Sequence, residues 1–143
     1  MSNGLKKKTV TIESGRDKGK TFLITEMPAI QADEWAHELF YHAATAGMDL
    51  KNVNVMNLDT KSMAGMIEIG AAIGSILGRI KPEESRRLKF ELLDKCVQIV
   101  PKGGQERMCI WDQEIQDMQN FTFLAAQVIG LHLDFLKQGE TSN

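Results

Sequence analysis

The segment from Gly15 to Thr21 is the part of the sequence that comes closest to a phosphate-binding loop. In such a loop, glycines let backbone N–H groups wrap the phosphates, and a lysine reaches the terminal groups. Here only three residues separate Gly15 from Gly19, where the loop requires four, and a β-rich run follows Lys20 where the loop requires a helix. A hairpin turn explains these residues fully, so we predict no nucleotide or other cofactor.

Histidine and cysteine spacing gives no metal site. His37 and His42 resemble the two ligands of a zinc-protease helix, but they are five positions apart instead of four. That spacing turns them about 140° away from each other on a helix, so both cannot bind one ion. His132 lies in an apolar run and is typical of a hydrogen-bonded helix residue. Cys96 and Cys109 lack a histidine pair at zinc-site spacing, and we expect reduced, buried thiols.

No other segment combines a nucleophile with a local base and a group to orient it, which predicts a binding protein and not an enzyme. The formal net charge of -2, from 17 basic and 19 acidic residues, argues against a nucleic-acid partner. The longest apolar stretch, 63–80, is interrupted by charged residues and four glycines, so we predict no membrane span. The N-terminus has no apolar signal-peptide core, and we expect a cytoplasmic protein.

The first part of the chain predicts a β-hairpin followed by a helix. Residues 1–8 form a basic lead that we expect to be flexible. Alternating residues from Thr9 and a β-rich run from Thr21 to Glu26 predict the two strands of the hairpin. Pro28 then starts a helix over 29–46, which Gly47 ends. The stretch from Met48 to Leu58 has no convincing period and is predicted to be a connection.

A second helix, with Asp59 or Thr60 as its cap, is predicted to continue to Ile80. Its apolar residues are spread around most of its circumference, so we expect burial on several sides. Three glycines repeat every four residues, at Gly70, Gly74 and Gly78. Each costs about 1 kcal/mol relative to alanine, which predicts a neighbouring segment packed tightly against the stripe.

The last part predicts a third helix from Pro82, a short hairpin built from 97–100 and 108–111, and a long final helix. Asp112 is the predicted N-cap of this last helix, which should end near Lys137, before a disordered tail over 138–143. The expected fold is therefore α+β: one helix-rich domain over 9–137, with an N-terminal β-hairpin and a second short hairpin before the last helix.

Apolar side chains are the best candidates for a binding surface. The chain has eight methionines, whose flexible thioether side chains adapt to irregular partners. Met63 and Met66 lie beside the glycine stripe, and Trp35 and Phe40 lie on the first helix. We predict that these four residues contact a protein partner.

The segment from Gly15 to Trp35, which reads GRDKGKTFLITEMPAIQADEW, resembles small tail assembly proteins encoded in bacteriophage and prophage tail operons. The segments 63–66, 96–101 and 112–115 fit the same pattern. The resemblance implies a tail assembly chaperone of a long-tailed phage, made in the infected host cell. It also implies that the partners are the long, helical tape-measure protein and the tail-tube subunits that polymerise around it, and it brings no catalytic residues.

Two other functions are compatible with the sequence. A structural tail component, such as a tube or terminator-like ring subunit, could also use a small α+β domain, and either role allows a homo-oligomer. Stoichiometric copies in purified virions would indicate that structural role. A small-molecule or nucleotide-dependent enzyme is the third possibility, and nucleotide turnover that disappears with Lys20→Ala would support it.

Overall fold

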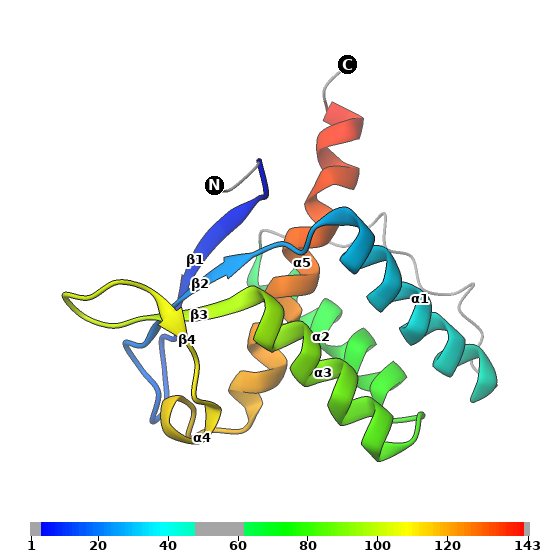
Figure 1. Cartoon of the computed structure of the whole chain (residues 1–143), viewed down its shortest axis with the longest axis horizontal. Coiled ribbons are helices and arrows are strands. Elements are labelled where there is room, and N and C mark those ends of the chain that lie inside the picture. The colour runs from blue at the N-terminus through cyan, green and yellow to red at the C-terminus, as the bar shows by residue number, and fades with distance from the viewer. Residues whose placement is uncertain (1–3, 48–61, 142–143) are drawn as a thin grey trace.

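A computed structural model describes residues 4–47 and 62–141 of the chain, and within them the fold is α+β as expected (Figure 1). In chain order the elements are β1 (Lys7–Thr11), β2 (Thr21–Thr25), α1 (Ala29–Thr45), α2 (Met63–Leu77), α3 (Pro82–Cys96), β3 (Val97–Val100), β4 (Arg107–Met108), α4 (Trp111–Glu114) and α5 (Gln119–Thr141). The predicted connection from Met48 to Leu58, and the predicted caps Asp59 and Thr60, lie outside the described residues.

The four strands form one antiparallel sheet in the order β1-β2-β3-β4. Both predicted hairpins are present: β1 pairs with β2, and β3 pairs with β4, with β2 and β3 joining the two hairpins at the centre. The first hairpin begins at Lys7, two residues earlier than the alternation indicated, so part of the basic lead belongs to the sheet. The central pairing brings Phe22 opposite Ile99, and these two residues are more than seventy positions apart in the sequence.

The core lies between one face of this sheet and the helices α1, α3 and α5, and α2 adds Ile76 to it. Phe22 and Ile24 on β2 are fully buried, because alternate strand residues point to the same face. Leu88 and Leu92 on α3, one turn apart, and Leu124 on α5 meet them in the same cluster. The buried faces of the strands and of the helices therefore pack together in one continuous core.

The first helix starts after Pro28, and its buried stripe consists of Trp35, Leu39 and Ala43. The spacing of four residues places these side chains on one face of the helix. The Trp35 indole N–H donates a hydrogen bond to the carbonyl oxygen of Leu88 at 2.9 Å, which satisfies the polar atom of a buried aromatic residue. Trp35 thus fixes α1 to α3.

The glycine stripe of α2 differs from the sequence expectation. A β-carbon added to Gly70 would lie 3.7 Å from side chains of α5, an ordinary packing distance, but one added to Gly74 would meet no atom of the described residues within 4 Å. A β-carbon at Gly78 would lie near the helix's own carbonyl oxygen of Gly74. Among the described residues, Gly70 is therefore the one glycine of the stripe that lies against a neighbouring helix, and the prediction of tight packing along the whole stripe is wrong. The cap of α2 is Ser62, whose Oγ accepts from the N–H of Gly65 at 3.0 Å.

The last helix begins later than predicted. Asp112 lies inside the four-residue helix α4, and Ile115 then adopts an extended backbone with its side chain buried. Burying Ile115 in the core interrupts the helical pattern, so α5 starts at Gln119 and continues to Thr141, past the end expected near Lys137. In the described part of the chain, no helix combines the length and the apolarity needed to cross a membrane.

Candidate interaction surfaces

The turn from Gly15 to Lys20 is closed around the carboxylate of Asp17. This side chain is fully buried and accepts hydrogen bonds from the backbone N–H groups of Gln116 at 3.0 Å and Asp117 at 3.0 Å. The amide nitrogen of Asn120 donates a third bond at 2.7 Å. Burial alone raises the pKa of Asp17, but the donors outweigh it and lower the pKa to about 2. The turn therefore holds a buried carboxylate that is negatively charged at neutral pH, close to the start of α5.

Two basic side chains complete this group, which we name the polar clasp: Arg16, Asp17, Lys20, Glu114, Asp117 and Asn120. The Lys20 ammonium donates to Asp17 at 3.1 Å and to the carbonyl oxygen of Glu114 at 2.7 Å. Arg16 bonds the Asp117 carboxylate through its backbone N–H at 2.8 Å and through its Nε at 2.5 Å. The Arg16 guanidinium hydrogen bond holds the pKa of Asp117 below its usual value. The lysine and the Arg16 N–H of the segment that resembled a phosphate site are therefore bound to carboxylates of the same chain. The backbone N–H groups of Lys18, Gly19 and Lys20 donate to backbone carbonyl oxygens of the same hairpin.

Gly15 cannot be replaced without strain at this point. Its φ is +83°, and a β-carbon would lie 2.6 Å from Oδ2 of Asp117. The glycine of the apparent phosphate motif is thus explained by the close approach of Asp117 and by left-handed backbone.

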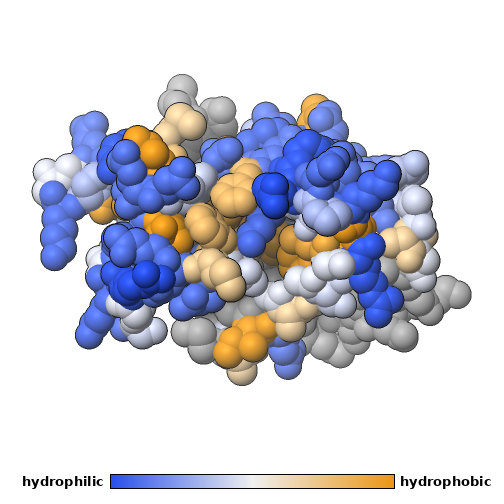
Figure 2. All heavy atoms as spheres, turned by 90° about the horizontal axis from the view of Figure 1, so that it is seen from below, coloured by the Kyte–Doolittle hydropathy of each residue, from blue (hydrophilic) through white to orange (hydrophobic). Residues whose placement is uncertain are grey.

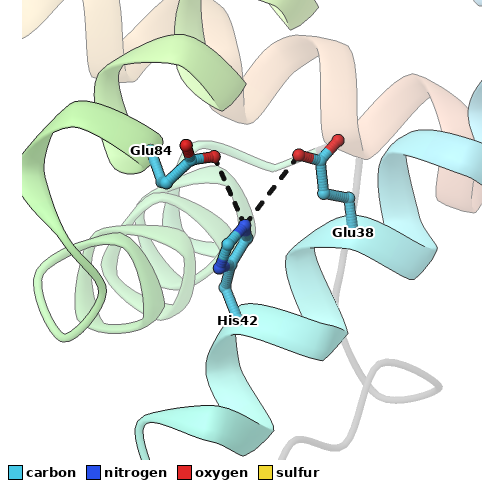
Figure 3. A group of neighbouring side chains, drawn as sticks. All are labelled: Glu38, His42 and Glu84. Carbon is cyan, nitrogen blue, oxygen red and sulfur yellow. Dashed lines mark ion pairs between the residues drawn. The ribbon is translucent and has the colours of Figure 1, made fainter.

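A second cluster joins α1 to α3. The Nε2 atom of His42 lies 3.9 Å from a Glu38 carboxylate oxygen and 3.4 Å from one of Glu84, as Figure 3 shows. One ligand atom from each residue fits within 4.8 Å, so the three could in principle hold a metal ion. However, the Arg87 guanidinium contacts both Glu38 and Glu84, and it supplies the positive charge that a cation would bring. The cluster is therefore an ion-pair network between two helices. His37, the other histidine of the apparent zinc motif, is exposed on α1 and takes no part in it.

His132 is held by hydrogen bonds to the backbone, and burial makes both cysteine thiols unreactive. The Nε2 atom of His132 accepts from the Met27 N–H at 2.9 Å, and Nδ1 lies 2.8 Å from the Val128 carbonyl oxygen. This pair of bonds assigns the ring proton to Nδ1, because only Nδ1 faces an acceptor. Burial raises the pKa of both Cys96 and Cys109 to about 12, so neither thiol is a nucleophile at neutral pH.

The four residues predicted to contact a partner differ in their exposure to solvent. Trp35 is only 7% exposed and belongs to the core, whereas Phe40, five residues on, is 48% exposed. A separation of five residues is about 140° on a helix, which turns Phe40 away from the buried stripe. Met63 and Met66 belong to α2, but their side chains lie outside the described part of the structure.

The exposed face of α2 forms a regular surface, although the sequence predicts burial on several sides of this helix. Its residues follow the alternating three-and-four spacing of a coiled-coil seam and are, in order, Ala64, Ile67, Ala71, Gly74 and Gly78. All five are exposed, and Ile67 is 64% exposed. We call these residues the α2 seam. The glycine repeat is the sequence signal for this surface, but by itself it predicts a buried contact.

Other large apolar side chains are exposed in the described chain: Ile30, Tyr41, Met108, Ile110 and Met118. Figure 2, a view from below, shows hydrophobic side chains in several separate patches between hydrophilic ones. The α2 seam differs from these residues because its members share one helix and one regular spacing.

A protein-family comparison matches residues 18–142 to a family described as phage tail assembly chaperone protein. The chain belongs to the phage tail assembly chaperone family. This assignment confirms the resemblance carried by the N-terminal segment and supports a role in phage tail assembly. Comparisons with curated proteins and with solved structures give no match.

Proposed function

We propose that this tail assembly chaperone binds helical segments of the tape-measure protein through the α2 seam. The observation that carries the proposal is the open, regular spacing of small residues around Ile67 on a helix that is packed on another side. A long helical partner exposes apolar residues at similar spacing before the tail tube encloses it. Tail-tube subunits would then replace the chaperone along the tape measure as the tube grows.

The small residues of the seam suit a tolerant contact between helices. Ala71 and Gly74 have no bulky side chain to hold a partner backbone away, and Gly74 has open space above it. Ile67 supplies an exposed apolar anchor at the same face. A seam of this kind accepts partner side chains of different shapes, because it presents few fixed pockets. Individual contacts are expected to be weak, at about micromolar affinity, with retention from many copies along one tape measure.

The direct experiment is co-expression of the chain with a helical tape-measure fragment from the same tail operon, followed by affinity capture. Gly74→Leu places a large side chain where the structure has open space, so it should leave the fold intact and reduce capture of the fragment. Ile67→Glu should also reduce capture, because a carboxylate would be desolvated in an apolar contact.

Met118→Glu is the matched control, since Met118 is 82% exposed and lies between α4 and α5, outside the seam. It should retain the fragment at the wild-type level. Equal capture by wild type, Gly74→Leu and Ile67→Glu would rule out the α2 seam. Failure of the wild type to capture any tape-measure fragment would rule out tape-measure binding itself.

A further inference from the structure

The outer edge of β1 carries backbone groups that no strand of the described sheet pairs. β1 is the terminal strand of the sheet and bonds only to β2 (Figure 1). The Ile12 N–H donates to Lys20 O at 2.9 Å, and the Glu26 N–H donates to Lys6 O at 3.0 Å, so the even-numbered residues face β2. By the alternation of an antiparallel ladder, the N–H and C=O groups of Lys7, Thr9 and Thr11 point to the open edge.

This edge is complementary to itself in an antiparallel arrangement. A two-fold axis at Thr9 places Thr9 opposite Thr9 of a second copy and Lys7 opposite the second copy's Thr11. Three residue pairs result, and each exchanges two hydrogen bonds, which gives about six bonds across the edge. No proline or β-bulge interrupts the five residues of β1. A two-fold axis at Lys7 would instead place two ammonium groups opposite each other, which is unfavourable.

Charges at the ends of β1 favour the same register. Lys7 and Glu13 are both exposed and both odd-numbered, at opposite ends of the edge. With the axis at Thr9, Glu13 is the diagonal neighbour of the second copy's Lys7, because that lysine lies opposite Thr11. The hydrogen bonds between the two strands of the hairpin continue to Ile12, so the backbone directly before Glu13 is still held at the edge of the sheet. Symmetry gives two such opposite-charge pairs.

We propose that two copies of the chain associate by antiparallel pairing of their β1 edges about Thr9, forming a continuous eight-stranded sheet. The occupant of the edge is a second copy because the backbone register and the Lys7–Glu13 charges are self-complementary. This association uses residues separate from the α2 seam, so it stands or falls independently of tape-measure binding.

Sedimentation velocity of the full chain, over a wide concentration series at low and high salt, tests the association. The wild type should show a concentration-dependent dimer that weakens at high salt. Thr9→Pro removes an N–H that faces the open edge, so it should leave the β1–β2 ladder in place while it abolishes the dimer. Thr9→Val keeps the N–H and is the matched control, which should dimerise as the wild type does. Circular dichroism verifies that both variants are folded.

Charge reversal tests the register without relying on proline. Lys7→Glu alone and Glu13→Lys alone should each weaken dimerisation, by roughly two- to thirty-fold for two lost pairs, and the double exchange should restore it. A wild type that is monomeric up to about 0.5 mM overturns the proposal, since contacts weaker than that are not specific association. A folded Thr9→Pro variant that still dimerises also overturns it, as does a double exchange that fails to restore the dimer.

Discussion

Replacing Asp17 by alanine should destabilise the domain strongly at neutral pH, although the residue lies in a turn. The substitution removes a fully buried carboxylate from the polar clasp and takes its acceptor from the donors at Gln116, Asp117 and Asn120. The backbone N–H groups of Gln116 and Asp117 would be left beside a void at the start of α5. Lys20 would keep its bond to the Glu114 carbonyl oxygen, so its ammonium would still have a hydrogen-bond acceptor.

The magnitude follows from the number and kind of bonds lost. Each donor left unsatisfied in a buried position costs about 1–3 kcal/mol, and breaking a buried charged pair costs about 3–5 kcal/mol. The losses at Gln116, Asp117 and Asn120 are not additive, because the turn can shift and admit water. We therefore expect a loss of about 3–4 kcal/mol, which lowers Tm by roughly 10 °C in a domain of this size.

The pH dependence gives a second readout of the same carboxylate. The pKa of Asp17 is about 2 in the folded chain, below its ordinary value of 3.8, so the unfolded state binds its proton more readily. Its contribution is therefore complete above the unfolded pKa and is lost as pH falls from about 5 to about 2. Asp17→Asn should flatten part of this acid dependence. The lowered pKa values of Glu114 and Asp117 have the same sign and leave a residual slope.

Urea denaturation monitored by circular dichroism, at pH 7 and at several lower pH values, measures both effects. Asp33→Ala is the control, because Asp33 is exposed on α1 and its loss should change stability by about 0.5 kcal/mol or less. If Asp17→Ala were no more destabilising than Asp33→Ala at pH 7, the polar clasp would not hold the turn to α5.

Three further substitutions or measurements follow from the described geometry. Gly74→Ala should raise the free energy of unfolding by about 0.4–1 kcal/mol, because the new methyl group meets open space and the unfolded chain loses freedom; a lower urea midpoint would show a hidden neighbour. Gly15→Ala should lower stability by about 1–3 kcal/mol, because the left-handed backbone and Asp117 both oppose a β-carbon; an unchanged Tm would contradict that geometry. Cys96 and Cys109 should react slowly with a thiol reagent in the native protein and rapidly in denaturant, and fast native labelling would contradict their raised pKa values.

Local patterns predicted the elements whose signals lie within one segment. Alternation in β1 and β2, the proline starts of α1 and α3, and the run at Val97 all depend on neighbouring residues. The start of α5 was not predictable in this way. Asp112 is a good N-cap by residue type, but the burial of Ile115 in the core interrupts the helix after it. The backbone N–H groups just before α5, those of Gln116 and Asp117, donate instead to Asp17, about one hundred positions earlier in the chain.

The contact surface shows the same division between local and tertiary information. Helical spacing places Phe40 about 140° from Trp35 and about 100° from Leu39, at the border of the buried stripe, so its partial exposure could have been derived. The glycine repeat did not reveal which glycine meets a neighbour, since that depends on where α5 crosses α2. Only Gly70 lies at that crossing, which leaves Gly74 on the open α2 seam.

The sequence separation within the polar clasp constrains the order of folding. The bond between Asn120 and Asp17 spans 103 positions, and β2 cannot gain its inner neighbour until β3 has been synthesised. During translation the apolar face of the first hairpin therefore stays incompletely covered until α3, β3 and α5, which follow it in the chain, have left the ribosome. Contacts of such long range form slowly. We expect the nascent chain to acquire its native core only after β3 and α5 have emerged from the ribosome, in one late and cooperative step.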